Sequence, residues 1–286
     1  MQQVLRSLFV DLLIQKTLKV KSSVTKRDNA YSVPRLTINI KNSVPYMELR
    51  DKLFTEEQYL KQLAKYTNKI SGLENEISQF VNNKVEFDAS IYYGRLVDYR
   101  VNSIVTKYSM GIGLECIQQD YLQTIKAMHG SWTPYGDYLK MLWLLSIGIM
   151  LEYDDNVIHE LLMLIDKKEV KDRVYDVLLN YRFPERKKLA DCVFDNIPYR
   201  AILEVSDLAK TDKTQAIKRL EKYLKKEWYR GHSDYYWYND HKYGIVHDGY
   251  WSFESGALVK VLGLDDSCLK GLPYYPYDMV HWNDIK

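Results

Sequence analysis

Apolar residues recur every three or four positions along most of the chain after residue 55, and this helical spacing constrains the fold more than any other feature. The motif TEEQ at 55–58 is a capping box, whose side chains satisfy the free backbone amides at the start of a helix. We expect a helix after residue 55, one after residue 89, one from about 155 to 165, and others over 115–128, 134–151, 170–180, 186–194, 198–210 and 212–231.

Turn-forming residues are scarce, with 13 Gly and 7 Pro in 286 residues, and no alternating run is long enough to indicate a sheet. We therefore predict an all-α, multi-helix globular protein. The segments 136–155 and 249–266 share one order of features: a glycine, an aromatic residue, an apolar helix and a double aspartate. This echo suggests two packed helical halves, which we place at 47–160 and 161–286.

Charge is unevenly distributed along the chain. Residues 1–46 hold eight Lys/Arg and two Asp/Glu, a net charge of +6, whereas the remaining 240 residues hold 32 and 36, a net charge of −4. We interpret 1–46 as a poorly patterned basic leader and keep open the alternative that it lies upstream of the true start, with Met47 as the alternative start. The mildly acidic body lacks the basic stripe of a nucleic-acid binder, so no direct contact with nucleic acid is expected.

The longest apolar run, 141–151, is eleven residues, and a membrane-spanning helix needs roughly 20. We expect it to be a buried core helix and the protein to have no membrane partner. The three cysteines are far apart and form no CxxC pair, which argues against a disulfide framework or a zinc knuckle. A cytoplasmic location is the natural expectation.

Three histidines fall within sixteen residues and have acidic neighbours, which raises the possibility of a metal-dependent hydrolase. The residues concerned are His232, His241 and His247, with Asp234, Asp240 and Asp248 beside them. Imidazole and carboxylate groups suit zinc or manganese. However, no two histidines have the i, i+4 spacing that places two ligands on one helix face. We therefore predict no metal site, no cofactor and no catalytic residue, and keep the hydrolase as an alternative.

The stretch after residue 250 combines apolar and acidic residues in a way that indicates structure more than chemistry. Trp251 and Phe253 are expected in the core, and Glu254 as a buried structural carboxylate that needs a hydrogen-bond partner. Asp265 and Asp266 follow an apolar helix and are expected to cap the next one. The competing hypothesis pairs His247 with Glu254 or Asp248 as acid and base.

Several motifs together resemble the PoNi family, the immunity proteins of PoNe polymorphic nuclease toxins. The C-terminal motifs are EKYLKKEWYRGH (221–232), HDGYWSFESGALVKVLGLDDSCLK (247–270) and YYPYDMVHW (274–282); the N-terminal ones are MELRDKLFTEEQY (47–59) and YGDYLKMLWLLSIGIMLE (135–152). The resemblance implies an all-helical protein of two parts that is not an enzyme. It further implies that the chain neutralises a cognate bacterial DNase of the PD-(D/E)xK type by binding it directly.

The aromatic loop before residue 250 is the surface that we predict to bind the toxin, because aromatic anchors dominate many interfaces and acidic groups complement a DNA-binding cleft. The predicted partner-binding residues are Asp234, Tyr235, Tyr236, Trp237, Tyr238, Asp240 and Asp248. Two alternatives remain open: the rings only pack the last helices together, or the chain is a helical adaptor for an unrelated protein.

Overall fold

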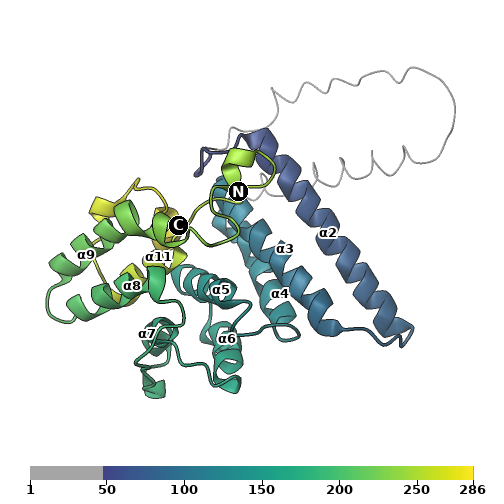
Figure 1. Ribbon diagram of the computed structural model, residues 1–286, viewed down its shortest axis with the longest axis horizontal. Coiled ribbons are helices and arrows are strands. Elements are labelled where there is room, and N and C mark those ends of the chain that lie inside the picture. The colour runs from purple at the N-terminus through teal and green to yellow at the C-terminus, as the bar shows by residue number, and fades with distance from the viewer. Residues whose placement is uncertain (1–47, 286) are drawn as a thin grey trace.

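The computed structural model describes residues 48–285, so the expectations about the leader 1–46 and about Met47 lie outside the described residues. Every regular element of the described residues is helical, which confirms the all-α prediction (Figure 1). The longer helices are α2 (Glu56–Asn82), α3 (Ala89–Ser109), α4 (Gln118–Met128), α5 (Tyr138–Met150), α6 (Asp155–Lys167), α7 (Arg173–Arg182), α8 (Asn196–Leu208), α9 (Lys213–Lys222) and α11 (Phe253–Leu262).

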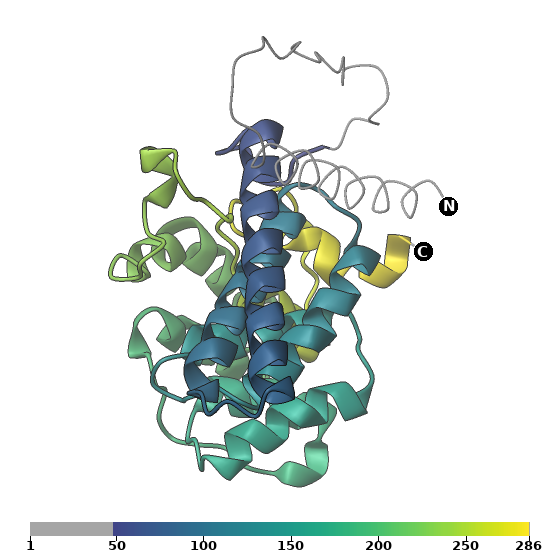
Figure 2. The ribbon, with the colours of Figure 1, turned by 90° about the vertical axis from the view of Figure 1, so that its right-hand side faces the viewer.

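The first described helices form an antiparallel group in which α2 lies on the outside, as the two views show (Figures 1 and 2). The predicted capping box is present at its start: the Gln58 amide donates to Thr55 Oγ1 at 3.3 Å, and the Thr55 amide donates to Gln58 Oε1 at 2.9 Å. The face of α2 that carries Tyr59, Leu63 and Leu73 is buried. The other face is mostly exposed, so α2 is held from one side only.

The apolar helix α5 lies at the centre of the molecule and packs against α11 from the C-terminal part of the chain. Close approach depends on Gly256, because a Cβ atom there would lie 2.4 Å from Met150 Sδ. One large apolar cluster includes buried residues from both parts of the chain. A separate small apolar cluster around Phe54, Tyr59 and Met110 packs at the N-terminal end of α2. The division at residue 160 therefore stays a prediction, since the core runs across it.

The prediction of a helix over 186–194 is wrong. Only a single 3₁₀ turn, Pro184–Arg186, precedes an irregular segment. Carboxylates at the start of α7 hold this segment: the Ala190 amide donates to Asp176 at 2.7 Å, and the Phe194 amide donates to Asp172 at 2.7 Å. These long-range bonds satisfy backbone groups that a helix would have paired locally, so the helical spacing of the segment does not decide its structure.

Two other helices differ from their expected form. The apolar helix starts at Tyr138 instead of 134, after a turn in which the Thr133 amide donates to Asp137 at 3.3 Å. The expected helix 212–231 begins as predicted, with Asp212 accepting from the Gln215 amide at 3.0 Å, but contains a π-helical turn, Tyr223–Glu227, before α10 (Trp228–Gly231). A π turn brings residues five apart onto one face, here Tyr223 and Trp228.

None of the helices that the structure describes is both long enough and apolar enough to span a membrane.

Candidate functional site

Residues 232–250, which we call the strap, cross from the C-terminal part of the molecule to α2 and α3 (Figure 1). Consecutive tight turns bend its first half, with backbone bonds from Tyr235 to His232, from Tyr238 to Tyr235 and from Asp240 to Trp237. Its second half begins with a 3₁₀ turn, Asp240–Tyr243, and continues as an irregular segment toward α11. The strap contains all seven predicted partner-binding residues, and they differ in burial and in hydrogen-bond partners.

Asp248 anchors the far end of the strap to α2 and α3. Its Oδ1 atom accepts hydrogen bonds from Tyr66 at 2.8 Å, from Thr106 at 2.7 Å and from the Gln62 amide group. Loss of solvent raises the pKa of Asp248 to about 6, although the bonds from Thr106 and Tyr66 oppose this shift. Asp248 thus holds the strap to the N-terminal helices, and its Oδ1 atom already accepts three hydrogen bonds within the molecule.

His247 forms a second anchor between two carboxylates. Its Nδ1 donates to Asp240 at 2.7 Å, and its Nε2 lies 3.2 Å from Asp51 in the first described segment. Burial alone would lower the pKa of His247, but the bonds and charges of Asp240 and Asp51 outweigh it and raise the pKa to about 9. Burial likewise opposes ionisation of Asp51, and the hydrogen bond from His247 outweighs it and lowers the pKa of Asp51. At neutral pH the cluster is a buried imidazolium between two carboxylates.

A short hydrogen-bond chain extends this cluster to the surface. The Tyr250 hydroxyl donates to Asp240 at 2.7 Å and accepts from His241 Nδ1 at 2.7 Å. Desolvation lowers the pKa of His241, which keeps it neutral and able to donate one proton in this way. Asp240 is therefore the acceptor for two strap residues, His247 and Tyr250, and His241 is linked to it through Tyr250. Its side chain is only 17% exposed.

The aromatic residues of the strap divide into inward and outward groups. Trp237 is 8% exposed and stacks on Trp228 with ring centroids 5.6 Å apart, while Tyr238 packs on Tyr229 at 4.6 Å. Tyr235 is half-buried and donates its hydroxyl proton to Asp195. Tyr236 is 76% exposed, and Asp234 beside it is also exposed. Of the seven predicted residues, Asp234 and Tyr236 face solvent, and the other five are engaged within the molecule to different degrees.

Glu254 lies at the base of the strap as a buried carboxylate with donors around one oxygen. Oε1 accepts from Trp228 at 2.8 Å, from Ser252 at 2.5 Å and from Tyr223 at 3.3 Å. The π turn places Tyr223 and Trp228 on the same side for this purpose. Loss of solvent raises the pKa of Glu254 to about 7, against the opposing effect of these bonds. Glu254 touches neither His247 nor Asp248 through any described hydrogen bond, so the geometry does not join them as an acid–base pair.

The other residues that we predicted to be structural differ in their surroundings. Trp251 and Phe253 are buried in the main core. Asp265 lies one residue before the N-cap position of the 3₁₀ turn Ser267–Leu269, and its side chain accepts from the Ser267 amide at 3.0 Å. Asp266 is buried and accepts from Tyr275 at 2.6 Å, so its side chain holds the following loop instead of capping the turn.

The histidines of the alternative metal hypothesis are engaged in hydrogen bonds. His232 is buried; Nδ1 donates to the Trp228 carbonyl at 2.6 Å, and Nε2 accepts from Tyr199 at 3.0 Å. Burial lowers its pKa to about 4, consistent with this neutral state. Both nitrogens of His247 face carboxylates. Within residues 48–285, no group of three His, Cys, Asp or Glu side chains is arranged to hold a metal ion.

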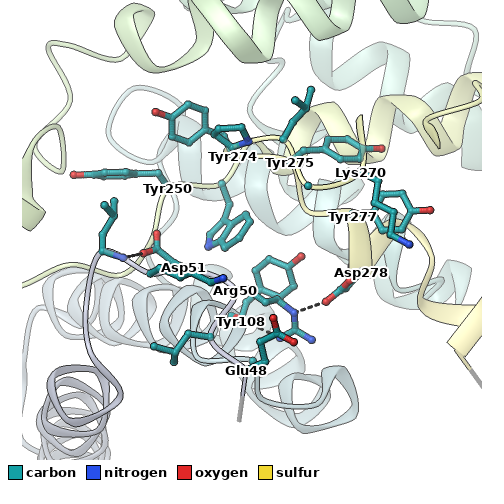
Figure 3. Close-up of a pocket in the computed structure, with 18 of the residues that line it drawn as sticks. Glu48, Arg50, Asp51, Tyr108, Tyr250, Lys270, Tyr274, Tyr275, Tyr277 and Asp278 are labelled. Atoms are coloured by element: carbon teal, nitrogen blue, oxygen red, sulfur yellow. Dashed lines mark hydrogen bonds and ion pairs between the residues drawn. The ribbon is translucent and has the colours of Figure 1, made fainter. Parts of the chain in front are cut away.

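A pocket of about 1060 Å³ lies beside the strap, between the first described segment and the loop 270–278 (Figure 3). Arg50 crosses its floor, bonding Asp278 at 2.6 Å and lying 4.7 Å from the centre of the Tyr108 ring. Tyr250 forms part of one wall and Lys270 part of the rim. Among the described residues that line it there is no Ser, Cys or His, the side chains that most often act as nucleophile or general base. The charged side chains of its lining are Glu48, Arg50, Asp51, Lys52, Lys270 and Asp278.

Sequence reasoning missed the N-terminal partners of the strap, namely Asp51, Gln62, Tyr66 and Thr106. They lie between 142 and 196 positions away in the chain, and nothing in their local sequence marks them as partners. Gln62 lies in the middle of α2 and is buried. The only signal in the sequence was a polar residue next to Leu63 on the apolar stripe of this helix.

Comparison with known proteins gives the class of this strapped, all-helical protein. Residues 50–163 match the family described as "PoNe immunity protein (PoNi), N-terminal", and residues 170–279 match "PoNe immunity proteins (PoNi), C-terminal". The chain belongs to the PoNi family of PoNe immunity proteins, which confirms the resemblance seen in the sequence. The family implies that the protein binds a toxin protein.

A solved structure supports the same fold. Protein PA2201 from Pseudomonas aeruginosa is similar with a TM-score of 0.61 and 15% sequence identity, over 82% of this chain and 98% of that one. At this level of identity the likeness concerns the fold alone. A search of curated proteins gives no match.

Proposed function

We propose that the protein is a cytoplasmic immunity protein that binds a cognate DNase toxin directly and blocks it, without catalysis, cofactor or nucleic-acid contact of its own. The observation that carries this proposal is the pair of PoNi matches, which together extend from residue 50 to residue 279.

The contact with the toxin includes the exposed part of the strap, Asp234 and Tyr236. The other five predicted residues serve to hold this part in place: Tyr235, Trp237, Tyr238, Asp240 and Asp248. A loop fixed before binding loses little conformational entropy on complex formation, which favours affinity. Anchoring at both ends, through Asp248 on α2 and α3 and through Trp237 on Trp228, supports such a role.

Co-expression with a PoNe-type toxin, sought first among the genes next to this one, tests the function. Cells that produce the toxin are expected to survive when the chain is present and to die when it is absent. A toxin variant lacking nuclease activity serves as the control for toxicity, and the purified pair is expected to co-elute. If cells die equally with and without the chain, the protein is not the immunity partner of that toxin.

A further inference from the structure

A surface outside the predicted loop carries the most exposed large apolar side chain of the described residues. Tyr135, in the turn before α5, is 85% exposed, and Ile197, at the start of α8, is 71% exposed. Phe194 lies between these elements and is partly exposed, with its ring 5.6 Å from that of Tyr135. The sequence pattern predicted helices over 134–151 and 186–194 and did not indicate that these side chains are exposed.

This surface is connected to the exposed part of the strap. Asp195, next to Phe194, accepts the hydroxyl proton of Tyr235, which places Tyr236 beside the same segment. The Tyr236 side chain itself is 76% exposed, so its ring is available for contact with a partner. The surface therefore extends from the strap across the segments 194–197 and 133–140.

Acidic groups predominate among the side chains of this surface. The segments 133–140, 194–197 and 234–236, taken with Asp98, carry four carboxylates and one cation: Asp98, Asp137, Asp195, Asp234 and Lys140. Lys140 pairs with Asp98 and, at 2.7 Å, with Asp137. Arg95, one turn earlier on α3, is the next cation along that helix. Counting both cations, the surface keeps a net charge of −2.

We propose that this aromatic–acidic face, formed by Tyr135, Phe194, Ile197 and Tyr236 among these carboxylates, is the surface that binds the basic DNA-binding side of the toxin. The inference rests on the proposed function and assigns its contact surface. Surfaces that bind DNA are basic, so an acidic face complements them and accelerates encounter. Exposed aromatic rings supply the apolar anchors that such a contact needs.

The negative charge of the face favours the toxin over a second copy of this chain as its partner. The four apolar side chains together expose roughly 500 Å², which suits the centre of an interface and not a whole one, since a standard contact buries about 800 Å² on each partner. In a twofold dimer the same patch would meet itself, and its carboxylates would face one another. A basic partner removes that repulsion.

Binding of the nuclease-inactive toxin to purified variants tests the inference. We expect Tyr135→Lys and Ile197→Lys to weaken binding about tenfold or more, as loss of an interface anchor does. Matched controls outside the face are Tyr181→Lys on α7 and Val81→Lys at the end of α2, both exposed, for which we expect less than about a threefold change. Both face positions are largely exposed, so thermal unfolding is expected to remain that of the wild type.

The outcomes separate the two proposals. Wild-type chain that neither binds the toxin nor protects cells would overturn the proposed function. Wild-type binding that Tyr135→Lys and Ile197→Lys leave unchanged would overturn only the aromatic–acidic face. A wild-type dimer in sedimentation that these substitutions dissociate, while toxin binding persists, would assign the face to self-association and also overturn the inference.

Discussion

The imidazole of His247 lies 3.2 Å from the carboxylate of Asp51, across 196 positions of the chain. This contact, with Asp240 on the other imidazole nitrogen at 2.7 Å, ties the strap to the first described segment. Each group is buried or nearly so, so removing one partner leaves a charge without compensation. The strap therefore owes its position to a buried charge cluster as well as to aromatic packing.

Stability should fall as pH rises from about 7 to 9.5. The pKa of His247 is about 9 in the folded state against 6.5 for a free imidazole, so the folded state binds more protons in this window. The stabilisation is fully present below about pH 6.5 and is lost as pH passes 9, a change of roughly 3 kcal/mol. Denaturant unfolding at several pH values measures it. His247→Asn should flatten the dependence, and His241→Gln should not; equal slopes for all three proteins would contradict the assignment.

Replacement of Glu254 separates its structural role from a catalytic or binding one. Glu254→Ala should lower the free energy of unfolding by about 1–3 kcal/mol, because Trp228 and Ser252 lose a buried acceptor. Glu254→Gln keeps an acceptor in the same place and should cost less at pH 7. Urea unfolding of both variants measures the difference. A Glu254→Ala protein of wild-type stability that no longer binds toxin would reverse this interpretation.

Asp234 and Asp240 should respond differently to the same charge reversal. Asp234→Lys changes an exposed side chain and should weaken toxin binding several-fold with an unchanged melting temperature. Asp240→Lys places a cation against the His247 imidazolium and should destabilise the fold by about 3 kcal/mol or more. Calorimetry of binding and thermal unfolding distinguish the two effects. Equal loss of stability in both variants would show that Asp234 also holds the strap.

Gly249 should be far less tolerant of alanine than Gly244. Both have positive φ, +117° and +64°, but a Cβ at Gly249 would lie 1.9 Å from Ser109 Oγ, whereas one at Gly244 meets nothing within 4 Å. Gly244→Ala should cost about 1 kcal/mol from backbone strain alone. Gly249→Ala should cost at least about 2 kcal/mol more, because Ser109 must move and its bond to the Asp248 carbonyl is lost. Similar unfolding free energies for the two variants would refute the crowding at Gly249.

The fold was largely predictable because its signals are local. The capping box at Thr55, the Asp212 cap and the apolar stripes of α2, α5 and α6 act over one or two turns of chain. Prediction failed over 186–194, where Asp172 and Asp176 bind backbone amides from fourteen to twenty-two positions away. The burial of Trp251, Phe253 and Glu254 followed from their apolar setting.

The sequence by itself determined the helices, the acidic balance of the body and the family to which the chain belongs. Tertiary structure decided which strap residues face solvent. Asp234, Asp240 and Asp248 are chemically alike and equally suited to bind a partner. Only Asp240 and Asp248 meet buried donors, from His247 within the strap and from Tyr66 and Thr106 on distant helices. Buried carboxylates require such donors, and their supply depends on how distant segments pack together.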